Sequence, residues 1–146
     1  MNIRRATIAD IDSIAPLFDQ YRQFYKQPSH LESATAFLTE RLSKHESIVF
    51  LAEENSHFMG FVQLYPSWSS VSMKRVWILN DLFVSPAFRG KGIGKNLLEA
   101  CTQFAKETGA ISLTLKTAVD NKPAQRLYDS CGWIQETKFI SYKFTF

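Results

Sequence analysis

Cysteine and histidine are scarce in this 146-residue sequence, which has two cysteines, Cys101 and Cys131, and three scattered histidines. Two cysteines fit a reducing cytosol better than a disulfide-stapled fold, so we expect free thiols and a cytoplasmic protein. The spacing of the cysteines and histidines provides no zinc constellation, and we expect no metal. Neither cysteine has a histidine in its motif, which argues against a cysteine nucleophile.

Long hydrophobic runs and clusters of positive charge are also missing. No apolar stretch approaches the ~20 residues of a membrane span, so we expect no membrane partner. The N-terminal stretch MNIRRATIADID contains acidic residues and lacks the apolar segment of a secretory signal. The net charge is +3 without any run of lysine and arginine, which favours no nucleic-acid partner. A few local positive charges are nevertheless enough to help bind a polyanionic ligand.

Apolar and aromatic residues are plentiful. Hydrophobic residues make up 45% of the chain and aromatic residues 14%. A chain of this length buries about two-thirds of its unfolded surface, so it forms a core without a metal or a disulfide. No linker, repeat or shift in composition divides the sequence, and we predict a single domain over residues 1–146.

The N-terminal part is predicted to hold one strand and two helices. Residues 3–6 form a short strand pattern, and Thr7 with Asp10 makes a capping-box pattern that opens a helix. Apolar residues then recur at helical spacing. A second capping-box pattern, Ser29 with Glu32, opens the next helix.

Strands dominate the middle of the sequence. Residues 47–53 and 58–65 are apolar runs joined by a polar turn, which predicts a β-hairpin. The serine-rich residues 66–72 predict a loop. Residues 76–84 predict a third long strand, which Pro86 ends.

Helices and strands alternate in the C-terminal part. A glycine-rich loop, residues 89–94, leads directly into a helix, and residues 111–117 alternate as a strand does. Asn121 is expected to cap a last helix that ends before Gly132, and residues 133–146 are expected to give one or two final strands. The predicted order is β-α-α-β-β-β-α-β-α-β-β.

The strand, glycine loop and helix together favour an anion site. The first backbone N–H groups of a helix lack partners, and the helix dipole adds positive potential there. Glycines let the backbone approach an anion without a Cβ in the way. The loop has glycines at positions 90, 92 and 94, and its flanking cations are Arg89, Lys91 and Lys95.

Three anion sites compete for this loop. A Walker loop requires Gly-x-x-x-x-Gly-Lys followed by Ser or Thr, but Lys95 is followed by Asn96 and position 89 is not glycine. A Rossmann fingerprint requires Gly-x-Gly-x-x-Gly, whereas these glycines are spaced Gly-x-Gly-x-Gly after antiparallel hairpins. The third alternative is a loop that holds the pyrophosphate of coenzyme A.

Two motifs make the third alternative specific. The pattern Arg89-x-x-Gly92-x-Gly94, after a strand that ends Leu-Phe-Val, resembles the acetyl-CoA signature of the GNAT superfamily of N-acetyltransferases. The segment NKPAQRLYDSCG, residues 121–132, resembles that family's Asn-x-x-Ala-x-x-x-Tyr-x-x-x-Gly helix. The resemblance covers essentially the whole chain. It implies an α/β fold with a mixed, mostly antiparallel, splayed sheet of about seven strands flanked by four helices.

The resemblance also implies how acetyl-CoA, the co-substrate, is bound. Strand-end backbone would pair with the pantetheine arm, one N–H there would stabilise the oxyanion, and loop amides would hold the pyrophosphate. The implied cofactor-binding residues are Leu82, Phe83, Val84, Arg89, Gly90, Lys91, Gly92, Ile93, Gly94, Lys95, Asn121 and Ala124.

Two residues are candidates for acid–base chemistry. Tyr128 matches the family tyrosine that faces the sulfur, and a phenol with a pKa near ~10 keeps a proton to donate to a thiolate. By spacing alone, Tyr128 also fits the apolar face of a helix. Asp81, in an otherwise apolar strand, is the candidate base for the amine. A structural role for Asp81 is the alternative, because a buried carboxylate requires partners.

The acceptor is less determined. The segment from Trp77 to Gly94 resembles the branch that acetylates diamines and polyamines, with relatives that act on histones or small amines. That branch often has glutamate where this chain has Asn80, so one negative charge is absent. Tyr21 and Tyr25, with Asn80, are the expected substrate-binding residues. We expect a small amine acceptor and a homodimer; transfer to a protein amine, or acyl-CoA binding without catalysis, are the alternatives.

Overall fold

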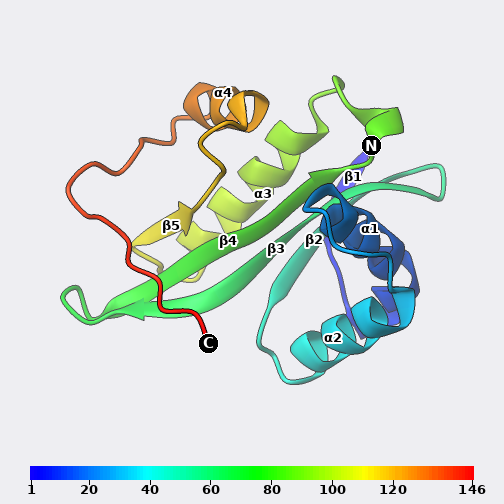
Figure 1. The fold of residues 1–146 in the computed structure, drawn as a ribbon, viewed down its shortest axis with the longest axis horizontal. Helices are drawn as coiled ribbons and strands as arrows, with labels where there is room; N and C mark the ends of the chain where they lie inside the picture. Colours follow the sequence, from blue (N-terminus) through cyan, green and yellow to red (C-terminus); the bar gives the residue numbers. More distant parts are fainter. The chain divides into compact units, whose positions relative to one another are not determined.

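The computed structural model describes residues 1–146. The chain divides into two compact units, Met1–Lys116 and Thr117–Phe146. Figure 1 shows the elements of both units along the chain. The single domain predicted from the sequence stays a prediction.

The first unit is built on a five-stranded sheet. Its strands are β1 (Asn2–Arg5), β2 (Ile48–Glu54), β3 (His57–Ser69), β4 (Lys74–Val84) and β5 (Ser112–Leu115). They lie in the order β1-β2-β3-β4-β5. The first four pair antiparallel and β5 pairs parallel to β4, which confirms the mixed, mostly antiparallel sheet.

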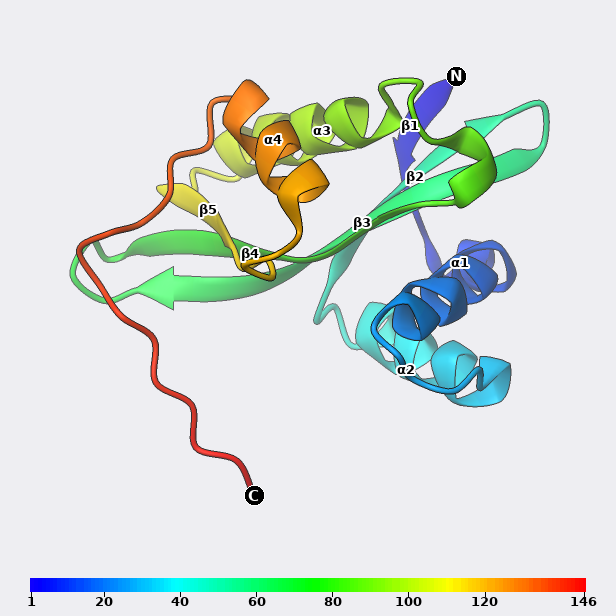
Figure 2. The same ribbon diagram turned by 45° about the horizontal axis from the view of Figure 1, so that its top comes forward.

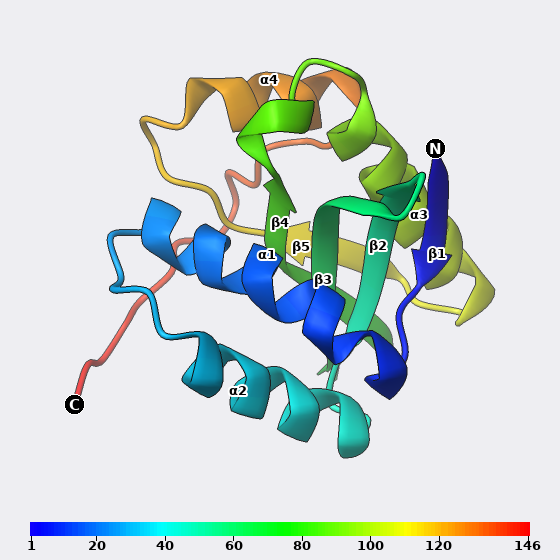
Figure 3. The same ribbon diagram turned by 90° about the vertical axis from the view of Figure 1, so that its right-hand side faces the viewer.

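Helices cover both faces of this sheet. The helices α1 (Ile11–Phe24) and α2 (Leu31–Ser43) lie on one face, and α3 (Ile93–Glu107) lies on the other, as Figure 2 shows. In Figure 3 α1 crosses in front of the central strands, with α2 alongside it. Because both faces of the middle strands are covered, β3 reads as a continuous apolar run, and Phe61, Val62 and Leu64 are fully buried.

The second unit contains one helix, α4 (Lys122–Ser130). The Asn121 side chain caps it by accepting from the Ala124 N–H (3.3 Å), and Gly132 follows it with a φ of 86°, as the sequence predicted. No strand follows. The prediction of about seven strands is therefore wrong, and the sheet has five. Residues 133–146 carry alternating apolar residues, but alternation forms a strand only where a neighbouring edge supplies hydrogen bonds.

Two local predictions are also wrong. Residues 66–72 were expected as a loop, but β3 runs on to Ser69 because cross-strand pairs continue there. Trp68 pairs with Arg75, whose guanidinium lies 3.9 Å from the Trp68 ring centroid. Ser29 does not cap α2; the His30 ring does, by accepting from the Ser33 N–H (3.1 Å).

A buried carboxylate joins α1 to α2 instead. Asp19 is 7% exposed and accepts hydrogen bonds from the Ser29 hydroxyl (2.6 Å) and the His30 N–H (2.8 Å). The Gln23 amide also donates to it (3.2 Å). The hydrogen bonds from Ser29 and His30 hold the pKa of Asp19 below its usual value. The connection between the two helices is thus fixed by hydrogen bonds to one charged group.

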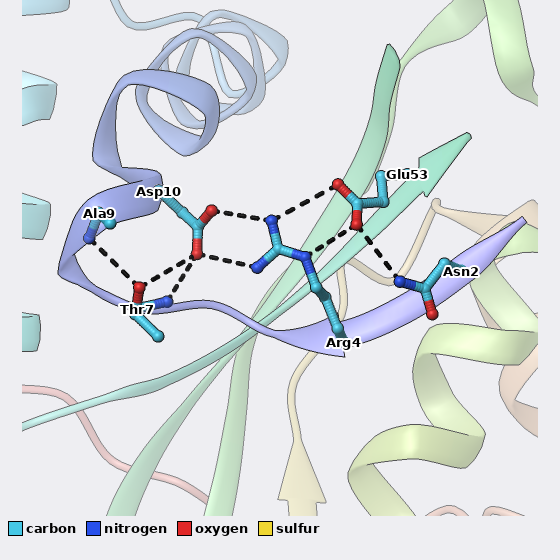
Figure 4. A network of polar contacts seen from close by, with 6 residues as sticks. All are labelled: Asn2, Arg4, Thr7, Ala9, Asp10 and Glu53. Atoms are coloured by element: carbon cyan, nitrogen blue, oxygen red, sulfur yellow. Dashed lines mark hydrogen bonds and ion pairs between the residues drawn. The ribbon is translucent and has the colours of Figure 1, made fainter. Parts of the chain in front are cut away.

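A second charged network joins β1, the short helix η1 (Ile8–Asp10) and β2, as Figure 4 shows. Arg4 donates to Asp10 at 2.8 and 3.0 Å and to Glu53 at 2.8 Å. Asp10 also accepts from the Thr7 N–H (2.8 Å), which completes the capping box that the sequence predicted. The Arg4 hydrogen bonds, ahead of the Thr7 contact, lower the pKa of Asp10 to about 2.

The first prediction concerns this network. Because the folded pKa of Asp10 is depressed, its stabilisation is present above the ordinary value near ~4 and is lost as the pH falls toward about 2. We expect Asp10→Asn to unfold about 1 kcal/mol more easily at pH 7, and the difference from the parent to vanish near pH 2. Urea unfolding at several pH values measures this. Asp12→Asn, an exposed change in the next turn, is the control; an equal loss there would contradict the assignment.

The second prediction concerns the close approach of β3 to the end of β4. A Cβ on Gly60 would lie 2.6 Å from the Phe83 carbonyl oxygen and 3.2 Å from the Val84 Cα, and both neighbours are backbone. We expect Gly60→Ala to cost about 2 kcal/mol of unfolding free energy through overpacking. Ser67→Ala in the same strand is the matched control. Equal stability of the two variants, measured by thermal unfolding, would show that the strands can separate freely here.

Candidate active site

An irregularity in the β3–β4 ladder organises the candidate site. Gln63 pairs with Asp81, but the next β3 residue, Leu64, pairs with Leu79, so Asn80 is an extra residue with no partner on β3. Two residues of β4 therefore span one step of β3, which is a β-bulge. Such an insertion bends the strand and redirects the side chains that follow it.

The bulge changes the face of the sheet on which the β4 side chains that follow it lie. A regular strand would carry Trp77, Asp81 and Phe83 on one face. Here Trp77 contacts the α3 side, with its ring 5.0 Å from that of Phe104. Asp81 and Phe83 lie on the α1 side instead: the Phe83 and Tyr21 rings are 6.3 Å apart, and Tyr21 also interacts with Asp81. The extra residue thus brings the candidate base under α1.

Asp81 lies in a buried polar cluster. It is 3% exposed, and two amides donate to it, Gln63 to Oδ2 (2.5 Å) and Asn80 to Oδ1 (2.9 Å). Burial raises the pKa of Asp81, while the hydrogen bonds from Gln63, Asn80 and Tyr21 act in the opposite direction. Its pKa is therefore shifted from the ordinary carboxyl value toward neutrality, which suits a group that must accept a proton.

Tyrosines surround this carboxyl group. The Tyr21 hydroxyl donates to the Asn80 carbonyl oxygen (3.3 Å), and the Tyr25 ring packs edge-on at 5.0 Å from Tyr21. Burial and the Asp81 charge raise the pKa of Tyr21, and the same causes raise the pKa of Tyr65 to about 12. Both phenols therefore keep their protons. The three predicted substrate residues, Tyr21, Tyr25 and Asn80, thus lie together beside Asp81.

Sequence reasoning missed two members of the cluster, Gln63 and Tyr65. The available signal was weak: a single glutamine inside the apolar run of β3, which places a polar side chain in the middle of the sheet. Gln63 is fully buried, and its Oε1 atom has no hydrogen-bond partner.

The β4 edge is open beyond the cluster. β5 pairs with β4 only over Val76 to Leu79, so the part of β4 after Leu79 is not paired with β5. The predicted pantetheine-binding residues, Leu82, Phe83 and Val84, lie in this part. They remain paired with β3 on their other side. An extended ligand could therefore add to the β4 edge as a strand does.

The glycine loop leaves its amides free for a ligand. Gly90 and Gly92 have φ values of 79° and 78°, which favour glycine, and their Cβ positions face open space. No side chain caps α3 at Gly92, and the N–H groups of residues 90–95 donate no hydrogen bond to the rest of the backbone. This row of unpartnered donors at a helix N-terminus fits a pyrophosphate.

The glycine loop carries positively charged side chains around its free amides. Lys91 and Lys95 are exposed, and the Lys91 ammonium is 5.7 Å from the Phe88 ring centroid. The Arg89 guanidinium lies over the Phe83 ring (5.6 Å) and donates to the Val84 carbonyl (2.9 Å). Arg89 thus joins the loop to the β4 end. Ile93 and Gly94 begin α3, with Ile93 buried in the core.

The second unit holds the remaining predicted residues. Asn121 and Ala124 form the capped start of α4, and Tyr128 lies two turns later with its ring 6.0 Å from that of Trp133. Tyr128 is partly buried. The roles of Asn121, Ala124 and Tyr128 stay predictions.

The remaining cysteine and acidic side chains form no further reactive or metal-binding group. Both cysteines are free thiols, and burial raises the pKa of Cys101 to about 12, which makes it a poor nucleophile at neutral pH. No group of three or more His, Cys, Asp or Glu side chains is arranged to hold a metal ion. No helix combines the length and the apolar composition needed to cross a membrane.

Comparison with known proteins identifies the family. The acetyltransferase (GNAT) family matches residues 12–133. The chain is 54% identical to the N-acetyltransferase YhfO of Bacillus subtilis, over 97% of this chain and 95% of that protein. A crystal structure of a probable acetyltransferase has a TM-score of 0.95 and 42% identity, covering 100% of this chain and 98% of the other. An aminoglycoside N-acetyltransferase in complex with CoA shares the fold, with a TM-score of 0.80 and 21% identity, over 98% of this chain and 93% of that one. The chain therefore belongs to the GNAT family and is an acetyl-CoA-dependent N-acetyltransferase.

Proposed function

We propose that the enzyme transfers acetyl directly from acetyl-CoA to the primary amine of a small molecule, with Asp81 as base and Tyr128 as acid. The observation that carries the proposal is the position of Asp81. It is a buried carboxyl group with a raised pKa, and it lies at the bulge beyond which the β4 edge is open. An amine that enters beside Tyr21 and Tyr25 would meet this group.

The reaction requires two proton transfers, and we assign them to two separate groups. An alkylammonium must lose one proton before its nitrogen can attack, and we assign that proton to the Asp81 carboxylate. The nitrogen then bonds to the thioester carbon, the carbon–sulfur bond breaks, and the leaving sulfur takes a proton from the Tyr128 hydroxyl. The second nitrogen proton restores the phenol. Asp81 releases the first proton to solvent, and no acyl-enzyme is required.

Backbone groups would hold and polarise acetyl-CoA. The free amides of residues 90–95 suit the pyrophosphate, and the open edge at Leu82–Val84 suits the pantetheine arm. An N–H of that edge would stabilise the oxyanion, as preorganised donors do in acyl transfer. Asn121 and Ala124 are proposed to complete the cofactor site.

A small amine is the acceptor that the cluster favours. The cluster contains one carboxylate and two partly buried phenols, Tyr21 and Tyr65. One carboxylate can pair with one ammonium group. A Caenorhabditis elegans relative, 25% identical over 92% of this chain and 83% of that protein, is named thialysine N-epsilon-acetyltransferase, and thialysine is a small amine. We also propose that the enzyme is related to the diamine and polyamine branch. A homodimer and a cytoplasmic location are further proposals. A panel of amines, amino acids and peptides tests the acceptor; turnover of peptides alone would favour the protein alternative.

The third prediction tests the phosphate loop. Lys95 is the third residue of α3, where glutamate is favourable to the helix dipole but repels a pyrophosphate. We expect Lys95→Glu to keep the parent's unfolding temperature and to bind acetyl-CoA at least about tenfold more weakly. Thermal shift and calorimetry measure this, since ligand at ~100 times its Kd adds about 2.7 kcal/mol of stability.

Lys106→Glu, in the last turn of the same helix, is the matched control for Lys95→Glu. It makes the same charge change away from the loop and should leave the affinity for acetyl-CoA unchanged. Equal weakening in both variants would mean that only net charge matters, and no binding by the parent at millimolar acetyl-CoA would contradict the loop assignment itself.

The fourth prediction tests the acid. Tyr128→Phe removes only the hydroxyl, so we expect acetyl-CoA affinity to stay within about twofold of the parent while kcat falls about 100-fold. Tyr142→Phe, an exposed tyrosine of the same unit, is the control. Steady-state rates with the best amine of the panel, together with calorimetry, measure both effects. An unchanged kcat in Tyr128→Phe would assign the proton donation to another group.

A further inference from the structure

We propose that Gln63 and Asn80 form an amide clamp that positions the Asp81 carboxylate and keeps it competent as the base; this rests on the function proposed above. The clamp is defined by its two amide donors, one from β3 and one from the bulge of β4. Neither residue needs to contact the reacting atoms, so both are positioning residues.

The geometry of the clamp fixes both oxygens of the carboxylate. The Gln63 Nε2 atom donates to Oδ2 at 2.5 Å, and the Asn80 Nδ2 atom donates to Oδ1 at 2.9 Å. Because the two donors approach different oxygens, the carboxylate cannot rotate about its Cβ–Cγ bond without losing one of them. Its remaining lone pairs keep a defined direction for the proton of the amine.

The burial of Gln63 is difficult to explain by packing alone. Gln63 is fully buried among apolar neighbours on β3, and its Oε1 atom has no partner, which is an unfavourable arrangement for an amide. A leucine or methionine would fill similar space without an unpaired acceptor. What glutamine supplies, and those residues do not, is the N–H donor to Asp81.

Asn80 supplies the second amide donor of the clamp. It is the extra residue of the bulge, and its side chain is exposed, so packing does not require an amide there. A carboxylate in its place would put a second negative charge beside Asp81 and would raise the pKa of Asp81 further. The amide instead stabilises the charged form and offsets part of the effect of burial, which remains the larger cause and keeps the pKa of Asp81 raised.

The clamp makes a prediction with a defined sign. Hydrogen bonds to the charged form lower the pKa of a carboxyl group, so removing one donor raises it. A base with a higher pKa becomes active only at higher pH. We therefore expect Gln63→Met, and separately Asn80→Ala, to move the acid limb of the pH profile of kcat/KM upward by about one pH unit. Asn80→Asp, which replaces the donor by a charge at nearly the same size, should move it further.

The experiment combines two readouts. The first is the pH profile of kcat/KM for the best amine, with acetyl-CoA affinity measured in parallel and expected to be unchanged. The second is the titration of the Asp81 carboxyl carbon by NMR in the absence of any substrate. Gln103→Met, an exposed glutamine on α3 that bonds to Glu107, is the control for loss of an amide. It should change neither readout.

The outcomes separate this inference from the proposed function. If the parent turns over amines and Gln63→Met and Asn80→Ala keep its pH profile and its Asp81 titration, the clamp is overturned and the acetyltransferase mechanism stands. If the NMR titration moves upward in both variants but no limb of the pH profile follows it, the hydrogen bonds of the clamp to Asp81 stand, but Asp81 is not the base and the catalytic role of the clamp is overturned. Should Gln63→Met fail to fold, Asn80→Ala and Asn80→Asp carry the test, since Asn80 is exposed.

Discussion

The extra residue at position 80 is the constraint on which the site depends. Side chains of a strand alternate between two faces, and here the two faces have different coverings, α1 on one and α3 on the other. One inserted residue therefore decides which helix Asp81 and Phe83 meet. Without the bulge, the carboxyl group would point toward the α3 side with Trp77, away from Tyr21 on α1.

The end of the β4–β5 ladder lies next to the bulge. β5 leaves β4 at Leu79, one residue before the extra one, so the ladder ends where the strand bends. The bulge turns Asp81 toward α1, and the following residues of β4 have no neighbour on the β5 side. Asp81 and the residues of the open edge, Leu82 to Val84, therefore follow one another on the same strand.

Stability elsewhere compensates for the polar cluster inside the sheet. A carboxyl group and an incompletely bonded amide at the centre of β3 and β4 are unfavourable to folding. The helices α1 and α2 are held by core packing and, in addition, by charged networks. Asp19 fixes the connection of α1 to α2, and Arg4 ties β1 to Asp10 and Glu53. The helix that covers the site is therefore anchored at points away from it.

Much of the fold, and part of the site, could be predicted from the sequence. The capping box at Thr7, the β2–β3 hairpin and the glycine loop depend on local patterns, and each is confirmed. The bulge could not be predicted, because Asn80 looks like any other strand position. A role for Gln63 could not be predicted either, because it depends on the strand register that places Gln63 opposite Asp81. The strands expected over residues 133–146 failed because alternation describes what a segment can pair with, not whether an edge is available.

The helix starts show why the candidate anion loop can be predicted from the sequence more readily than the surroundings of Asp81. The chain enters α1 through η1 with Thr7 as its cap, α2 begins at the His30 cap and α4 at the Asn121 cap. The first turn of α3 has glycine in a left-handed conformation and no side-chain cap. Its donors are left for something outside the chain, and a missing cap can be seen in a sequence. The environment of Asp81 is built from β3, β4 and α1, and so becomes visible only when the three are brought together.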